Sequence, residues 1–69
     1  MQPADNDNRP RLMAPKEAAI ATSLSRTLLV LMAEAGEFPK PVSLSDRRNA
    51  YIRQEVEDWI DKKIASRAA

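Results

Sequence analysis

The stretch that decides the fold runs from Leu24 to Ile52 and reads LSRTLLVLMAEAGEFPKPVSLSDRRNAYI. Ser25 is a good N-cap, because its hydroxyl can accept a hydrogen bond from a backbone N–H two or three residues further on. Gly36 stands where a left-handed residue commonly ends a helix. A helix over about 26–35 is therefore predicted, as the second helix of a helix-turn-helix.

A two-stranded wing over about 42–52 is predicted directly after that helix. Two prolines, at 39 and 41, favour extended chain. Residues 42–44 and 50–52 alternate with period two, and residues 45–49 between them are turn-formers and arginines. A hairpin alone is marginal in water, so the wing must pack on the helices. The side chains expected to do this are Phe38, Val42, Leu44 and Tyr51.

The first helix of the motif is predicted over about 15–21. Pro15 suits the first helical position, because its missing N–H has no intrahelical partner there anyway. Glu17 in the first turn complements the helix dipole. The polar break 22–25 follows, and it holds a single leucine, as in a tight turn with one buried anchor. The residues expected to face inward are Ala18, Ala21 and Leu12.

A third helix over about 54–66 covers the core. Its apolar residues recur at spacings of three and four, with acids early and lysines late; they are Val56, Trp59, Ile60 and Ile64. Trp59 is expected to contribute most to the core. The elements together predict an α+β winged helix-turn-helix domain over 11–66, after a disordered tail over 1–10 and before a frayed C-terminus over 67–69.

Composition restricts the function. The chain has 69 residues, which is enough for one small domain, and it contains neither cysteine nor histidine. Disulfides, thiolate and imidazole metal sites, and catalysis by cysteine or histidine are therefore excluded. No apolar run is long enough to span a membrane and no signal peptide is visible, so we expect a cytoplasmic protein, associated with the nucleoid when bound to DNA.

Four carboxylates, Glu55, Glu57, Asp58 and Asp61, resemble a cluster but fall mainly on the polar face of the third helix. We interpret them as a solvated surface and expect no catalytic residue and no metal site. With one glycine the chain has no phosphate-cradling loop, and we expect no cofactor and no small-molecule substrate.

The excess of positive charge lies in residues 25–53, which nearly coincide with the stretch that decides the fold. The chain has eleven basic and ten acidic residues, but residues 25–53 hold five basic residues against three acidic ones. In a helix-turn-helix the first residues of the second helix meet base edges in the major groove. Ser25, Arg26 and Thr27 occupy these positions, and the alternative is that Ser25 only caps the helix while Arg26 is solvated.

Arg47 and Arg48 are predicted at the tip of the wing, where they would contact a flanking groove or the phosphate backbone. Lys16 and Lys40 are further candidates for phosphate contact. Arg9 and Arg11 offer a weaker alternative, a short basic arm that reaches a phosphate or the minor groove. The predicted partner is double-stranded DNA.

The second helix is apolar all round between Leu28 and Met32. If Leu29 and Met32 pack inward, then Leu28 and Leu31 form an exposed strip one turn apart. Three interpretations remain open: burial of both sides by the wing and the third helix, contact with thymine methyl groups, or a contact between protomers.

Six segments of the chain together form a specific pattern: Lys16-Glu17, Thr22-Ser23-Leu24-Ser25-Arg26, Gly36-Glu37-Phe38-Pro39-Lys40-Pro41-Val42-Ser43-Leu44, Arg47, Tyr51 and Glu55-Val56-Glu57-Asp58-Trp59-Ile60. In these segments the chain from Arg11 to Ile64 resembles the AlpA-type excisionase and transcriptional-regulator family of small, MerR-like winged helix-turn-helix proteins, which usually has tryptophan at the position of Tyr51. The resemblance implies a recombination directionality factor of a mobile element that binds attachment-site DNA cooperatively, bends it and directs a tyrosine-type integrase toward excision. It also implies major-groove contact by Ser25, Arg26 and Thr27 and wing contact by Arg47.

The chain departs from the family pattern at several positions. The family usually has glycine at Ser23 and Ser45, a polar or aromatic residue at Val30, a basic residue at Leu31 and arginine at Ile52. The missing basic residue at Leu31 argues for shape readout, or for cooperative binding through apolar contacts between protomers. The alternative functions are a transcriptional regulator of a prophage or integrative element and, outside DNA binding, a protein interaction module that uses Leu28 and Leu31.

Overall fold

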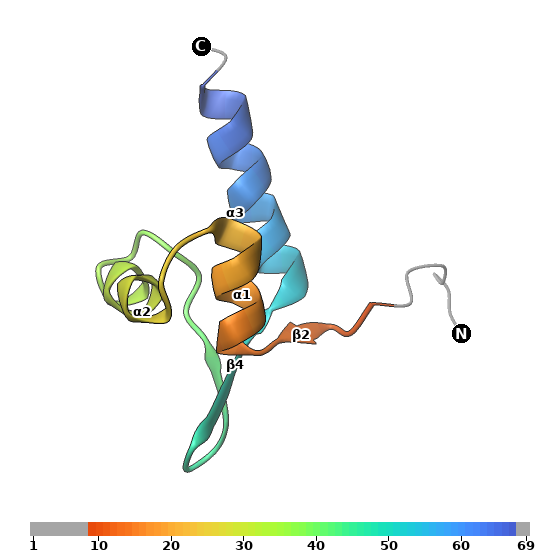
Figure 1. Ribbon diagram of the computed structural model, residues 1–69, viewed down its shortest axis with the longest axis vertical. Coiled ribbons are helices and arrows are strands. Elements are labelled where there is room, and N and C mark those ends of the chain that lie inside the picture. The colour runs from red at the N-terminus through yellow and green to blue at the C-terminus, as the bar shows by residue number, and fades with distance from the viewer. Residues whose placement is uncertain (1–8, 68–69) are drawn as a thin grey trace.

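A computed structural model describes residues 9–67, which form an α+β winged helix-turn-helix. Along these residues the elements are β2 (Leu12–Met13), α1 (Pro15–Thr22), α2 (Arg26–Glu34), β3 (Val42–Ser45), β4 (Arg48–Ile52) and α3 (Arg53–Ser66). Figure 1 shows the β3–β4 wing extending away from the helices on the side opposite the C-terminal end of α3. The predicted fold class is confirmed, with helix boundaries within one residue of those expected.

The helix ends are set by the residues that the sequence indicates. Pro15 is the first residue of α1. The backbone N–H of Leu28 donates to Ser25 Oγ at 3.0 Å, which confirms the N-cap of α2. Gly36 has φ +80°, and the N–H groups of Gly36 and Glu37 donate to the carbonyls of Ala33 at 3.1 Å and Met32 at 2.8 Å. These two hydrogen bonds form a Schellman motif, which satisfies carbonyl groups in the last turn of α2.

The turn between α1 and α2 depends on one left-handed residue that is not glycine. Ser23 has φ 65°. The N–H of Leu24 donates to Thr22 Oγ1 at 3.3 Å, and the Leu24 side chain packs against the core. The expected tight turn is therefore confirmed, but its leucine anchor is partly and not fully buried. The glycine that is usual in the family at this position would adopt the same φ without a steric cost.

The three strands form an antiparallel sheet in the order β2-β4-β3. Leu12 pairs with Ile52 and Met13 with Tyr51, while Val42 pairs with Ala50 across the wing. The pairing of β3 with β4 is irregular between Ser43 and Ser45. The turn of the wing comprises residues 46–47 and is shorter than the 45–49 expected, because Ser45, Arg48 and Asn49 join the strands.

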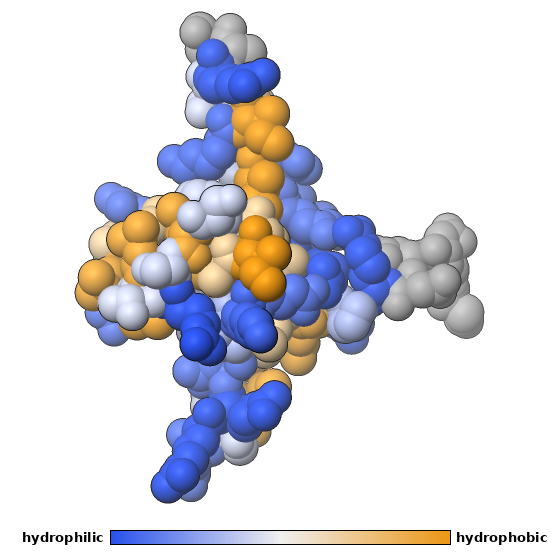
Figure 2. Space-filling model, in the orientation of Figure 1, coloured by the Kyte–Doolittle hydropathy of each residue, from blue (hydrophilic) through white to orange (hydrophobic). Residues whose placement is uncertain are grey.

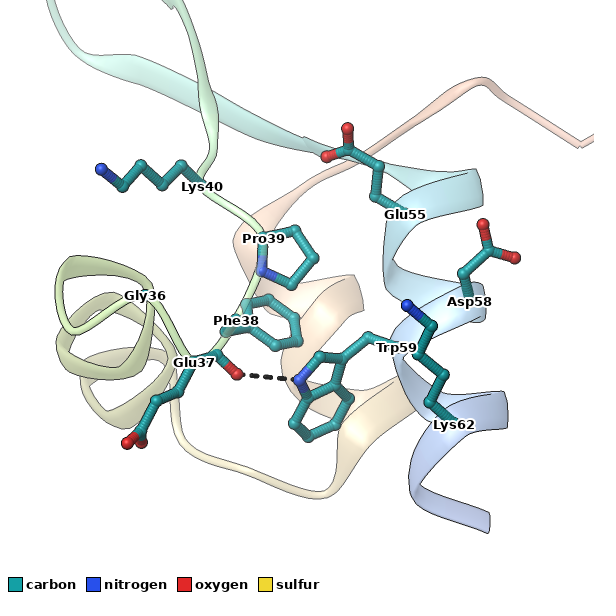
Figure 3. A pocket seen from close by; sticks show the side chains of 9 residues that line it. All are labelled: Gly36, Glu37, Phe38, Pro39, Lys40, Glu55, Asp58, Trp59 and Lys62. Carbon is teal, nitrogen blue, oxygen red and sulfur yellow. Dashed lines mark hydrogen bonds between the residues drawn. The ribbon is translucent and has the colours of Figure 1, made fainter. Parts of the chain in front are cut away.

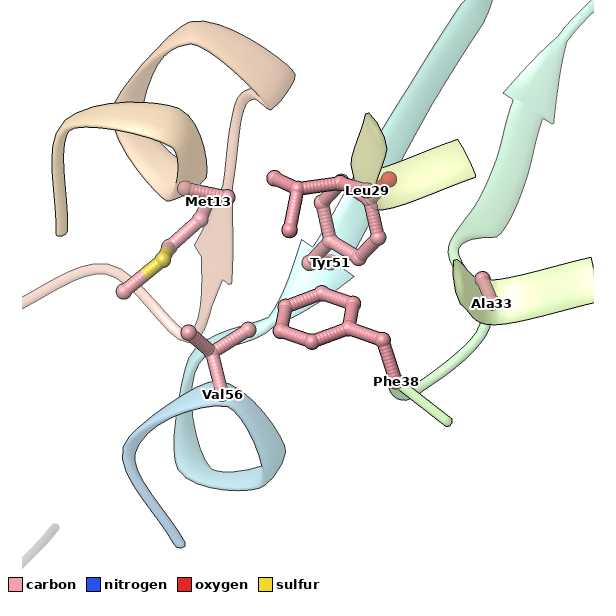
Figure 4. Close-up of a cluster of buried hydrophobic side chains, with 7 residues drawn as sticks. Met13, Leu29, Ala33, Phe38, Tyr51 and Val56 are labelled. Carbon is pink, nitrogen blue, oxygen red and sulfur yellow. The ribbon is translucent and has the colours of Figure 1, made fainter. Parts of the chain in front are cut away.

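The core lies where the three helices meet β4, as Figure 4 shows. Its buried members are Met13, Ala18, Leu29, Ala33, Phe38, Tyr51 and Val56. Tyr51, Leu29 and Val56 are the largest fully buried side chains. The expectation that Trp59 contributes most was wrong, because Trp59 is only partly buried and packs against the outside of this cluster.

Four further residues expected to face inward are exposed: Leu12, Ala21, Val42 and Leu44. Strand β2 has only two residues, and its register places Met13 beside Tyr51 on the core face. Leu12 must then point to the opposite face, because successive residues of a strand alternate. Ile64 is also exposed, since every residue of α3 from Asp61 onward lies beyond the body of the domain.

Aromatic rings join the segment after α2 to the rest of the domain. The Phe38 ring contacts Tyr51 and Trp59 edge to face, with centroids 5.4 Å and 4.9 Å apart. Trp59 Nε1–H donates to the carbonyl of Glu37 at 2.8 Å, as Figure 3 shows. These contacts fix the chain between α2 and the wing, so they determine where the wing leaves the body.

The predicted tail over 1–10 lies outside the described residues except for Arg9 and Pro10, and the predicted frayed end over 67–69 does so except for Arg67. Among residues 9–67 no helix is long and apolar enough to cross a bilayer.

Candidate nucleic-acid interface

The first turn of α2 carries the three residues predicted to meet the major groove. Ser25, Arg26 and Thr27 are all exposed. Ser25 uses an oxygen lone pair for the cap, as the structural alternative expected, but its O–H can still donate to an outside acceptor. The free N–H groups of a helix N-terminus favour anions, so this turn can approach a phosphate or a base edge without desolvating a carboxylate.

The wing places its two arginines at its far end. Arg47 is the second residue of the turn and Arg48 the first residue of β4, and both are exposed. Figure 2 shows a strongly hydrophilic surface over this end of the wing. Because the strands hold these guanidinium groups well away from the core, they can contact a groove beside the one that α2 would enter.

The two lysines proposed for phosphate contact lie in different surroundings. Lys16 is exposed on the first turn of α1. Lys40 is exposed between α2 and the wing and helps to line a groove whose other residues are Val30, Ala33, Glu34, Pro41 and Asn49. In Figure 3 the Lys40 side chain points away from Trp59. Lys40 is therefore near both proposed DNA-contacting elements, while Lys16 belongs to the supporting helix.

The apolar residues of α2 are not covered. Leu28 is 40% exposed, Val30 46% and Leu31 56%, whereas Leu29 is fully buried and Met32 packs against the core. The interpretation that the wing and α3 bury both sides of the helix was therefore wrong. Figure 2 shows this apolar surface over α2, and it leaves the DNA-facing and protomer-facing interpretations open.

Sequence reasoning missed a second apolar surface on α1 and α3. Ile20 is 72% exposed and Ile64 58% exposed. In Figure 2 hydrophobic surface runs along α3 toward the part of the domain where α1 lies. The spacing of Ile60 and Ile64 was visible in the sequence, but it was assigned to the core.

A buried arginine was also missed. Arg53 is 9% exposed and begins α3. Its side chain donates to the Glu17 carboxylate and to the Pro10 carbonyl, each at 2.5 Å, and its backbone N–H donates to the Arg11 carbonyl at 2.8 Å. These bonds attach the entering chain and α1 to α3, so Arg53 stabilises the frame that holds the interface. The only sequence signal was Lys16-Glu17, which the family resemblance marked without giving it this role.

The four carboxylates of α3 do not gather into one cluster. Glu55, Asp58 and Asp61 are exposed, and Glu57 forms an ion pair with Arg9 at 2.5 Å. Within residues 9–67 no three acidic side chains gather closely enough to hold a metal ion. The groove in Figure 3, between α3 and the segment 36–40, is lined by charges of both signs. Burial raises the pKa of the Tyr51 phenol above that of an exposed tyrosine.

Comparison with known proteins gives two matches. A family model described as "Prophage CP4-57 regulatory protein (AlpA)" matches residues 11–64. The uncharacterized protein ORF88 of Enterobacteria phage P4 is 30% identical over 67 residues, which cover 97% of this chain and 76% of the phage protein. No solved structure matches the chain. The family match confirms the resemblance that the sequence motifs indicate.

Proposed function

Because the chain belongs to the AlpA family of prophage regulatory proteins, we propose that it is a DNA-binding accessory factor of the excisionase type. It binds attachment-site DNA and directs an integrase of the tyrosine type toward excision of a mobile element. Such a factor acts by shaping DNA and not by catalysis, which agrees with a DNA-binding regulatory family. The observation that carries the proposal is the pairing of an exposed, N-capped Arg26 turn with an arginine-tipped wing on one small domain.

Each element has its own role on DNA. Ser25, Arg26 and Thr27 enter the major groove, where Arg26 pairs with guanine or holds a phosphate. Arg47 and Arg48 contact the flanking groove or backbone, and Lys40 and Lys16 neutralise phosphates. Five basic side chains are thus assigned to contacts with DNA, although the charge of the whole chain is nearly balanced. Most of the binding free energy should therefore come from the wing and the first turn of α2, and little from the net charge of the whole chain.

Several copies bind side by side and bend the DNA. The bent DNA with its bound copies then forms the surface on which an integrase assembles. Cooperative loading requires contacts between protomers. The predicted contact at Leu28 and Leu31 is available, because both side chains are exposed, and Ile20 with Ile64 provides a second apolar surface. Two apolar surfaces on different parts of one domain suit a head-to-tail array. In such an array each copy contacts one neighbour through its first surface and the other neighbour through its second.

The second candidate function is transcriptional regulation of a prophage or integrative element. It is favoured by the description of the matching family as a regulatory protein. The DNA contacts would be the same, and only the position of the site would differ, at a promoter instead of an attachment site. A third function, from another class, is a protein interaction module that uses Leu28 and Leu31, which the exposure of both residues supports.

An electrophoretic shift with duplex DNA tests the proposal. We expect retardation, with log K falling against log salt at a slope that corresponds to roughly four to six phosphate contacts. Stepwise, cooperative shifts on attachment-site DNA support excision, and stronger binding to a promoter fragment supports regulation. Binding that does not depend on salt, or no shift with any duplex, contradicts DNA binding and favours the interaction module.

A further inference from the structure

The structure divides the residues of α2 between two opposite faces. Leu29 is fully buried and Ala33, one turn later, is almost fully buried. Thr27 and Leu31 lie two positions to either side of Leu29, which is about 200° around a helix with about 100° per residue. They therefore share the face most remote from the core, one turn apart, and both are exposed. Leu31 is the most exposed of the large apolar residues of this helix.

The other two apolar residues flank this face. Val30 lines the groove between α2 and the base of the wing, together with Lys40 and Asn49. Leu28 lies on the opposite flank and is the least exposed of the three. Leu31 is thus the apolar side chain that a molecule approaching the outer face of α2 meets first.

Charge complementarity favours DNA as that molecule. The exposed Arg26 and the free N–H groups of the helix N-terminus lie beside the start of this face, and both attract phosphate. By the same rotation of about 100° per residue, Arg26 lies on the flank that Val30 shares, about 100° from Thr27. Glu34 ends the face one turn after Leu31, and its carboxylate is repelled by phosphates. The part of the helix that can enter a groove is therefore its first two turns, with Arg26, Thr27 and Leu31.

We propose that Leu31, together with the Thr27 methyl group, reads the 5-methyl groups of thymines in the major groove, so that the protein prefers duplex sites with thymine at the positions under the middle of α2. Thymine is the base that presents an apolar group there. The leucine side chain cannot hydrogen-bond to a base edge, but its methyl groups can pack against the 5-methyl group of a thymine and bury it. This inference rests on the proposed DNA binding. It moves Leu31 from the predicted protomer contact to DNA, which leaves Leu28 and the surface of Ile20 and Ile64 for contacts between copies.

Replacing thymine by deoxyuridine tests the inference, because it removes only the methyl group and keeps base pairing. The probe is a duplex enriched by the wild-type protein from a pool of random sequence, and its thymines are replaced one at a time. Each replacement removes one methyl group, and we expect at least one of them to weaken single-site binding about fourfold, which is the value of one buried methyl group. Leu31→Ala should weaken binding to the thymine duplex by a similar or larger factor and should no longer respond to that replacement.

Leu28→Ala is the matched control for single-site binding, where contacts between copies play no part. It removes the same atoms from the flank of the helix and should keep the sensitivity to the methyl group. Circular dichroism checks that both variants fold, as expected for exposed positions. If thymine and deoxyuridine duplexes bind equally, or no sequence is enriched although DNA is bound, the inference is overturned while DNA binding stands. It is also overturned if Leu31→Ala changes only cooperativity, which would assign Leu31 to a protomer contact. Failure to retain any duplex contradicts the proposed function itself.

Discussion

Arg53, at the start of α3, donates a hydrogen bond to Glu17, on the first turn of α1, at 2.5 Å. The guanidinium is nearly buried, while the side chain of Glu17 is 47% exposed. The contact joins the first helix of the helix-turn-helix to the helix that closes the domain. Because Arg53 also holds the Pro10 carbonyl, one side chain connects three segments that are far apart in the sequence.

Removing the carboxylate from this contact should destabilise the domain. Glu17→Ala leaves a buried guanidinium without its anionic partner, and we expect a loss of about 1–2 kcal/mol, reduced from the cost of a fully buried pair by the exposure of Glu17. Urea unfolding followed by circular dichroism measures it. Asp61→Ala, at an exposed position of α3, is the control and should change stability little. Equal stability of the two variants would contradict this role of Arg53.

Two substitutions at left-handed residues should have opposite signs. Ser23 and Gly36 have φ 65° and 80°. Ser23→Gly removes a steric cost and should stabilise the protein by about 0.5–1 kcal/mol. Gly36→Ala should cost about 1 kcal/mol through backbone conformation alone, because a Cβ at Gly36 would meet no atom within 4 Å. Thermal unfolding of both variants under the same conditions tests the pair, and a stabilising Gly36→Ala would refute the assigned conformation.

The indole N–H of Trp59 should contribute a small, separable part of the stability. Trp59→Phe keeps an aromatic ring against Phe38 but removes the donor to the Glu37 carbonyl. We expect a loss of about 0.5–1.5 kcal/mol, the usual net worth of one hydrogen bond. Hydrogen exchange should also become faster in the segment 36–40, which this bond fixes. Unchanged exchange there would mean that the bond does not position the wing.

Stability should fall at alkaline pH because of Tyr51. Its pKa is raised by burial above that of an exposed tyrosine, so the unfolded chain loses the phenolic proton first. Where the unfolded state binds fewer protons, the free energy of unfolding decreases as pH rises. The contribution is complete below the ordinary tyrosine pKa of about 10 and is lost as pH rises through the folded-state value. Tyr51→Phe should flatten this part of the stability curve, and an identical alkaline loss in both proteins would assign it to other groups.

The arginines should divide the work of DNA binding. Arg26→Ala should reduce the preference for a specific site over random DNA, because a base contact carries sequence information. Arg47→Ala and Arg48→Ala should weaken binding to all duplexes about equally and should lower the salt slope by about one each, because a phosphate contact releases a counterion. Competition titrations at several salt concentrations separate the two effects. Equal losses of specificity from all three variants would refute this division of roles.

The sequence by itself determined the elements and their ends. The Ser25 cap, Pro15 at the start of α1 and Gly36 after α2 act through bonds and steric limits within a few residues, so they can be interpreted without knowledge of the rest of the fold. The order of helices and wing, the arginines at its tip and the motif spacing were recognisable for the same reason. The excess of apolar residues in the middle of α2 over what one buried face can hold was also visible, but the sequence left open whether they are buried or exposed.

The tertiary structure alone decided which side chains form the core and which face outward. The two-residue strand β2 pairs with β4 in a register that buries Met13 and exposes Leu12. A shift of one residue would bury Leu12 and expose Met13 instead. The partners of Arg53 come from segments about forty residues away in the chain, which no local pattern encodes. Leu31 points outward because packing fixes the rotation of α2 about Leu29 and Ala33. Burial depends on the docking of distant segments, and that docking is absent from any single stretch of the sequence.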